Sequence, residues 1–186
     1  PNLLTTLQII FIPDSLALDA YTMATPLDSF KHKNGLTATE AFAQIPVLQN
    51  IRPWQIVNLA YLLGGIFLLY KKVFTWHAPV SMLLALFLLS GLFYAGDPSL
   101  YGSPGFHLSM GATMMAAFFI ITDPVSSATS QQGRIYYGIG IGILLYIIRT
   151  WGHYPDAVAF AVLLMNLAAP LIDTYTKPRA YGHQHS

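Results

Sequence analysis

Five apolar segments, separated by short polar turns, constrain the fold of this chain more than any other feature. They cover residues 54–70, 78–95, 107–122, 135–150 and 157–175. A helix needs about 20 apolar residues to cross ~30 Å of hydrocarbon, and each segment is near that length, although the third and fourth are marginal. Only 9% of all residues are charged, against roughly 25% in soluble domains. We therefore expect an all-α membrane protein with about five transmembrane helices. Helices buried in a large soluble core are disfavoured, because the turns are short and the charges few.

The segment before these helices is polar and interrupted by proline. Residues 13–53 predict a loop with one or two short helices, and Thr37 with Glu40 forms a capping-box pattern. We divide the chain into an outer segment (1–53), five transmembrane helices (54–175) and a tail (176–186). The chain begins with Pro1 instead of Met. We take this as an indication that an upstream part is missing here.

The basic residues of the loops predict the orientation of the helices. With five spans, one side holds Lys71, Lys72, Arg134, Lys177 and Arg179, and the other holds Lys31, Lys33, Arg52 and Arg149. Short loops carry the positive-inside rule, and without the long first loop the ratio is five to one. The tail is therefore predicted to be cytoplasmic, and residues 13–53 to lie outside.

Composition excludes several classes of site. A formal net charge of +1 argues against nucleic acid, which requires a clustered basic face. The absence of cysteine excludes disulfides, zinc–thiolate sites and iron–sulfur ligation by this chain. The "GIGIG" run (138–142) favours close helix packing over a nucleotide-binding loop, since no strand precedes it. His107 and His153 flank spans without the partners that a metal site needs.

Three aspartates stand at or within the apolar segments, where ionisable residues are costly and often mark ion pathways. They are Asp123, Asp156 and Asp173. Asp123 and Asp156 fall at span ends, where helix capping in water is the simpler explanation. For Asp173, inside the last span, a structural role and a cation pathway are equally open.

Three threonines follow an alanine, in "TMAT" (22–25), "MGAT" (110–113) and "SSAT" (126–129). Thr25 lies on the long outer loop, Thr113 within the third span and Thr129 on an inner loop. A threonine within a helix usually bonds its own backbone, and one in a Ser-rich loop is usually a turn residue. Position and spacing alone therefore give none of the three a special role.

A resemblance to a known family separates the threonines. The pieces "AFFIITDPVS", "IRTWGHYPDAVAFAVLLMN" and "APLIDTYTKPRAYGH" closely resemble the carboxyl-terminal part of the RnfD subunits of Rnf electron-transport complexes, called Rsx in some bacteria. The "TDPV" and "YP-acid" patterns are also similar to the homologous flavin-bearing membrane subunit of the sodium-pumping NADH:quinone reductase. The resemblance implies two five-helix halves in a ten-helix inverted-repeat fold like that of urea channels, with this chain as the second half.

The same resemblance implies a flavin. Members carry FMN bound through its phosphate to the last threonine of Ser/Thr-x-Ala-Thr, followed by Pro-Leu. Thr22, Met23, Ala24, Thr25 and Pro26 fit this pattern, with Thr25 as the attachment residue. Met23 departs from the Gly of the stricter pattern. The "MGAT" segment lacks the leading hydroxyl, and "SSAT" lies on the wrong side of the membrane.

The resemblance also implies the setting in which this flavin would work. It predicts a multi-pass subunit of the bacterial inner membrane, with the Thr25 loop on the periplasmic side and lipid around the helices. Electrons would pass between ferredoxin and NAD, coupled to ion movement, with iron–sulfur and second flavin subunits as partners. A second, non-covalent flavin, riboflavin, is compatible with the family. The alternatives are the quinone-reductase subunit and a channel for a small neutral solute.

Overall fold

The computed structural model describes residues 25–33, 35–154 and 156–176, and this part of the chain is helical without any strand. Short helices come first: α3 (Pro26–Lys31), α4 (Ala38–Gln44) and α5 (Pro46–Gln49). Long helices are α6 (Arg52–Tyr70), α7 (His77–Gly96), α10 (Gln131–Trp151) and α11 (Val158–Thr176). Between α7 and α10 lie α8 (Pro104–Ser109), α9 (Thr113–Met115) and the π-helix η1 (Ala116–Ile120).

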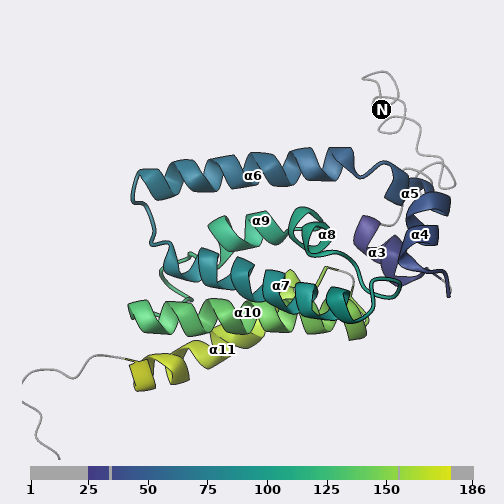
Figure 1. Ribbon diagram of the computed structural model, residues 1–186. Helices are drawn as coiled ribbons and strands as arrows, with labels where there is room; N and C mark the ends of the chain where they lie inside the picture. The colour runs from purple at the N-terminus through teal and green to yellow at the C-terminus, as the bar shows by residue number, and fades with distance from the viewer. Residues whose placement is uncertain (1–24, 34, 155, 177–186) are drawn as a thin grey trace, which may run out of the picture.

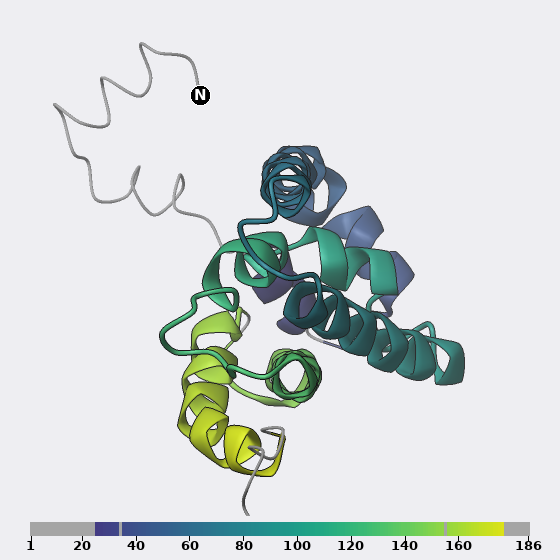
Figure 2. The same ribbon diagram turned by 90° about the vertical axis from the view of Figure 1, so that its left-hand side faces the viewer.

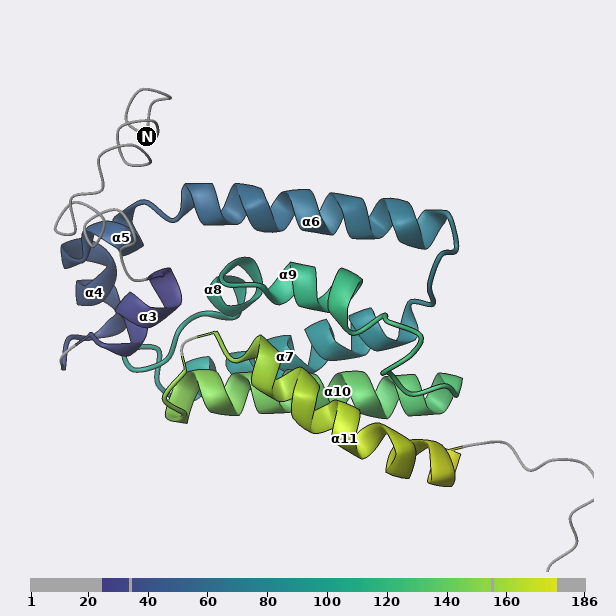
Figure 3. The same ribbon diagram turned by 180° about the vertical axis from the view of Figure 1, so that it is seen from behind.

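The long helices run lengthwise through one bundle (Figure 1). In Figure 2, α6 and α10 are seen nearly end-on, and the segment of α8 and α9 lies between them. The short helices α3, α4 and α5 gather at one end of the bundle, beside the start of α6 and the ends of α7 and α10 (Figure 3). The polar first segment thus forms a cap on this end, and the turn at 71–76 lies at the other end.

Three of the described helices, α6, α7 and α11, are long and apolar enough to cross a membrane. The helix α10 has 21 residues and is more polar, with Arg134, Arg149 and several tyrosines along it. Large apolar side chains on α6 stay exposed, among them Leu63 at 60%. A water-soluble fold would bury such a surface, so the chain is an all-α membrane protein.

The third apolar segment, residues 107–122, is not one continuous helix. It is broken at residues 110–112, between α8 and α9. After α9 its second half continues as the π-helix η1. Gly111 has a φ of +65°, a left-handed conformation that favours glycine. A Cβ on Gly111 would also lie 2.7 Å from a side-chain carbon of Leu27. The break therefore depends on glycine for both its backbone angle and its packing.

The predicted role of the "GIGIG" run in helix packing is confirmed. A Cβ on Gly138 would lie 2.5 Å from the backbone oxygen of Ala78, and one on Gly142 would lie 2.6 Å from that of Met82. Both glycines thus let α10 approach the backbone of α7. Gly140 faces α11 instead, against the flexible end of Met165.

The cap at the end of the bundle has its own small apolar core. Leu27, Ala41 and Leu48 come from α3, α4 and α5, and they pack with Phe106 and Met110 around α8. The predicted capping box is present, because the Thr37 N–H donates to Glu40 Oε2 at 2.8 Å and the Thr37 hydroxyl accepts from the Glu40 N–H at 3.3 Å. The apolar contacts of Leu27 with Phe106 and Met110 fix α3 against the broken third segment.

Candidate functional site

The predicted attachment residue begins the first described helix. Thr25 is the N-cap of α3, and its hydroxyl accepts a hydrogen bond from the Asp28 N–H at 3.3 Å. Pro26 follows at the first helical position, where its fixed φ suits the start of a helix. Thr22, Met23 and Ala24 lie outside the described residues. Thr25 is partly exposed, so its oxygen stands at the surface of the cap.

Aromatic contacts hold α3 in place. The ring of Phe30 lies 5.1 Å from that of Phe106 on α8 and 5.8 Å from that of Phe42 on α4, measured between centroids. Such pairs contribute about 0.5–1.5 kcal/mol each beyond the apolar area they bury. The segment that follows Thr25 is therefore a fixed element of the cap.

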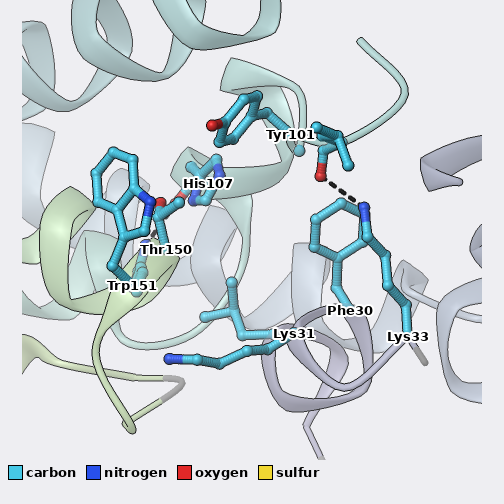
Figure 4. A pocket seen from close by; sticks show the side chains of 11 residues that line it. Phe30, Lys31, Lys33, Tyr101, His107, Thr150 and Trp151 are labelled. Carbon is cyan, nitrogen blue, oxygen red and sulfur yellow. Dashed lines mark hydrogen bonds between the residues drawn. The ribbon is translucent and has the colours of Figure 1, made fainter. Parts of the chain in front are cut away.

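A cavity of about 240 Å³ opens between α3, the turn at 100–102, α8 and the end of α10 (Figure 4). Its walls combine aromatic rings, from Phe30, Tyr101 and Trp151, with basic side chains. The residues that line it are Leu27, Phe30, Lys31, Lys33, Leu100, Tyr101, Gly102, His107, Arg149, Thr150 and Trp151. Three of the chain's nine Lys and Arg residues are in this set, and no carboxylate is.

The two lysines reach across the cavity to backbone carbonyls of other elements. Lys31 Nζ donates to the oxygens of Ile148 at 3.3 Å and Tyr154 at 3.4 Å. Lys33 Nζ donates to the oxygen of Leu100 at 2.5 Å and lies 4.6 Å from the centre of the Phe30 ring. Partial burial lowers the pKa of both amines from the usual 10.5, and the nearby Asp28 and Asp97 oppose that shift for Lys31 and Lys33 respectively.

Arg149 is a buried residue that also lines the cavity. Its side chain is only 1% exposed and pairs with Asp156, with Nη2 3.1 Å from Oδ1. Nη1 donates to the backbone oxygen of His107 at 2.9 Å, and Nη2 donates to the Thr113 hydroxyl at 3.0 Å. One guanidinium therefore binds both sides of the break between α8 and α9.

Asp156 and Asn58 bond further polar groups of the break. Asp156 Oδ2 accepts from the Ala112 N–H at 2.8 Å. Asn58, on α6, donates to the Gly111 oxygen at 3.0 Å and accepts from the Met114 N–H at 3.4 Å. Non-helical backbone at membrane depth is tolerated where protein groups bond it, and three segments of the chain supply those groups here.

The other predicted residues have local partners. Both carboxylate oxygens of Asp173 accept from the Thr129 N–H, at 2.9 and 3.1 Å, and Thr129 Oγ1 donates to one of them at 2.9 Å. Asp123 accepts from the Ser126 hydroxyl at 2.7 Å, and this bond lowers the pKa of the carboxyl below its usual 3.8. Thr113 and Thr129 are thus engaged in buried or interhelical bonds, whereas among the described residues the Thr25 side chain bonds only its own helix.

Two residues of this region, Arg149 and Asn58, were not predicted. In the sequence Arg149 counts only toward the charge of a short loop, and Asn58 is a single polar residue in the first apolar segment. A signal existed, because an ionisable or amide side chain inside an apolar segment is costly unless it has a partner. Within the described residues no three His, Asp or Glu side chains gather as they would around a metal ion.

The fold and the site define a multi-pass helical membrane protein with a broken helix and a basic, aromatic cavity at one end. Residues 1–182 match the NQR2, RnfD, RnfE family. The chain belongs to this family, as its carboxyl-terminal motifs predicted.

Curated relatives agree in their names, since each is the D subunit of an ion-translocating oxidoreductase complex. The chain is 56% identical over 190 residues to the one from Cellvibrio japonicus, across 99% of this chain and 53% of that protein. The protein of the same name from Pseudomonas aeruginosa strain UCBPP-PA14 matches at 57% identity, across 89% of this chain and 49% of that protein. The one from Marinobacter nauticus matches at 49% identity, across 98% and 53%. The chain thus spans about half the length of the curated relatives it matches.

Proposed function

We propose that this chain is one membrane-embedded part of a subunit in an ion-translocating electron-transfer complex of the ferredoxin:NAD type, and that it carries FMN on Thr25. The names of the relatives support the complex, and the attachment pattern supports the flavin. The family itself includes both quinone-reductase and Rnf subunits, so the relatives' shared name favours the Rnf-type role. The chain contains no cysteine, so iron–sulfur clusters would belong to partner subunits.

The single observation that carries the flavin proposal is the position of the cavity relative to Thr25. Leu27, two residues after Thr25 on the same short helix, lines a cavity with aromatic and basic walls. Flavin supplies one- and two-electron chemistry, and the protein supplies position and electrostatics. A phosphoester on Thr25 would hold FMN at high effective concentration beside this cavity without a binding equilibrium.

Among the three aspartates, Asp173 is the strongest candidate for an ion pathway. Its side chain is buried, at 8% exposure for the residue, and borders a hydroxyl-rich cavity that includes Ser126, Thr129 and Asn166. Asp123 holds an exposed turn and Asp156 pairs with Arg149, whereas Asp173 accepts from Thr129 and also borders this cavity. We place the Thr25 end of the bundle on the periplasmic side of the inner membrane.

A denaturing gel tests the flavin proposal directly. The natively expressed full-length protein should give a yellow band that fluoresces under ultraviolet light, and Thr25→Ala should abolish it. Thr25→Ser retains a hydroxyl and should keep some of the signal. Thr37→Ala is the matched control, because it removes the N-cap of the neighbouring helix without touching the attachment motif. Thr113→Ala and Thr129→Ala should also leave the band.

A band that survives Thr25→Ala would end the assignment to Thr25. A wild-type protein whose intact mass equals that of its amino acids alone would end the covalent-flavin proposal. It would then favour the alternative of a channel for a small neutral solute, which requires no flavin.

A further inference from the structure

The cavity at the end of the bundle has the chemistry of a site for a flat, negatively charged aromatic group. Its walls present three rings and three cations, and no carboxylate among the lining residues. Aromatic faces favour a planar partner, and basic side chains favour an anion. At about 240 Å³ the cavity is smaller than the ~300–1,000 Å³ of typical drug-sized pockets, so it suits a ring system better than a whole mononucleotide.

We infer that this cavity receives the isoalloxazine ring of the tethered FMN, and that Lys31 and Lys33 compensate the negative charge of the reduced ring. The inference rests on the proposed attachment at Thr25. The phosphate and the ribityl chain would then lie outside the cavity, toward the start of α3. Lys31 and Lys33 would act on the ring directly in this scheme, through charge and hydrogen bonding.

The two lysines are better suited to this task than Arg149. The guanidinium of Arg149 is already paired with Asp156 and bonded to His107 and Thr113. Lys31 and Lys33 each bond two backbone carbonyls and have no ion pair within the described part of the chain. An ammonium group has three donors, so each lysine keeps one N–H for a ligand.

Figure 4 shows how the side chains surround the space. Trp151, Thr150 and His107 come from one wall, and Phe30 and Lys33 from the opposite one, with Lys31 reaching in from α3. The rings of Tyr101 and Trp151 both pack against Phe93, with centroids 5.2 Å away in each case. The aromatic wall is therefore fixed by packing before any ligand binds.

Charge compensation has a measurable consequence for the flavin. Uptake of two electrons and one proton leaves the isoalloxazine ring with one more negative charge than before. Cations beside the ring stabilise that form relative to the oxidised one, which makes the reduction potential more positive. Removal of one cation should therefore make the potential more negative.

The experiment uses the full-length subunit in its complex, with the covalent flavin followed by spectroelectrochemical titration. Lys31→Gln and Lys33→Gln should each lower the equilibrium preference for the reduced form about tenfold, which is ~30 mV for a two-electron couple. Lys31→Arg should retain the wild-type potential. Lys71→Gln is the matched control, because it removes one positive charge at the opposite end of α6.

Fluorescence gives a second readout that is independent of charge. An indole close to the flavin quenches its emission, so Trp151→Leu should increase the fluorescence of the native protein. Trp76→Leu is the control. Trp76 is as exposed as Trp151, at 53%, and it lies at the start of α7, away from the cavity.

The two proposals fail in distinguishable ways. If wild type shows no fluorescent band on a denaturing gel, the attachment itself is wrong. If the band is present but Lys31→Gln and Lys33→Gln shift the potential no more than Lys71→Gln, the ring does not lie beside these lysines. Unchanged emission in Trp151→Leu likewise places the ring elsewhere.

Discussion

At the scale of single residues, Arg149 shows how a buried charge is made tolerable. A guanidinium with a 1% exposed side chain carries a desolvation cost that only a carboxylate and well-placed acceptors offset. Asp156 supplies the charge, and His107 and Thr113 supply the acceptors. These groups belong to both sides of the helix break, so the ion pair and the broken backbone stabilise each other.

Removal of the charge on Asp156 should destabilise the protein strongly. Asp156→Asn keeps an oxygen that can accept from the Ala112 N–H but leaves Arg149 buried without a counter-charge. We expect a loss of about 3 kcal/mol in the free energy of unfolding, the lower end of the usual range because the Asp156 side chain is 32% exposed. Thermal unfolding of the detergent-solubilised complex, followed by circular dichroism, measures the change.

The control for this prediction is Asp123→Asn. Within the described part of the chain, Asp123 accepts bonds only from the turn that follows it, so the loss of its charge should shift the unfolding transition much less. Equal shifts for the two variants would show that the Arg149–Asp156 pair contributes nothing beyond an ordinary turn contact.

At the scale of helices, the length of an apolar run predicted four elements well. The predicted segments 54–70, 78–95, 135–150 and 157–175 correspond to α6, α7, α10 and α11 within four residues at each end. Length alone did not predict where the marginal third segment breaks, because the break is stabilised by Asn58 and Asp156, which lie 53 and 44 residues from their partners Gly111 and Ala112. No local pattern reports side chains that arrive from other helices.

The glycines of α10 allow a test of helix packing at this scale. Gly142→Ala would place a Cβ 2.6 Å from the backbone oxygen of Met82, and backbone cannot move aside cheaply. Overpacking of this kind costs about 1–3 kcal/mol. Gly140→Ala meets only the flexible end of Met165 and gains up to ~1 kcal/mol of helix propensity.

The thermal stabilities of the two variants should therefore change in opposite directions. Both changes add one methyl group to the same helix, so composition and propensity are matched. If Gly142→Ala proves as stable as Gly140→Ala, α7 and α10 do not pack through their glycines.

At the scale of the whole molecule, the cap and the bundle together make a site that no single segment predicts. The proposed attachment residue, Thr25, followed from the resemblance to a family and its motif. The cavity did not, because its walls come from residues 27–33, 100–107 and 149–151, which only the fold brings together. The apolar runs predicted which segments form helices, but they carried no information on which basic side chains would line one cavity.

The orientation of this molecule in the membrane is the prediction on which the site's compartment depends. Asn50 lies at the end of the bundle that carries Thr25, and Val125 lies in the 121–130 turn before α10, at the end where Lys71 and Lys72 follow α6. Both residues are exposed, Val125 at 90%. The bias of basic residues toward the Lys71 end predicts that this end is cytoplasmic.

The chain contains no cysteine. In a full-length protein without other cysteines, a single Cys substitution therefore reports one position at a time. A membrane-impermeant maleimide should label Asn50→Cys in intact cells, and should label Val125→Cys only after the membrane is permeabilised. The reverse pattern would place Thr25, its cavity and Lys31 on the cytoplasmic side. A flavin there would face the cytoplasmic electron carriers directly, and the periplasmic placement proposed here would be wrong while the covalent attachment could still stand. Labelling and the gel test of Thr25 therefore separate where the redox group lies from whether it exists.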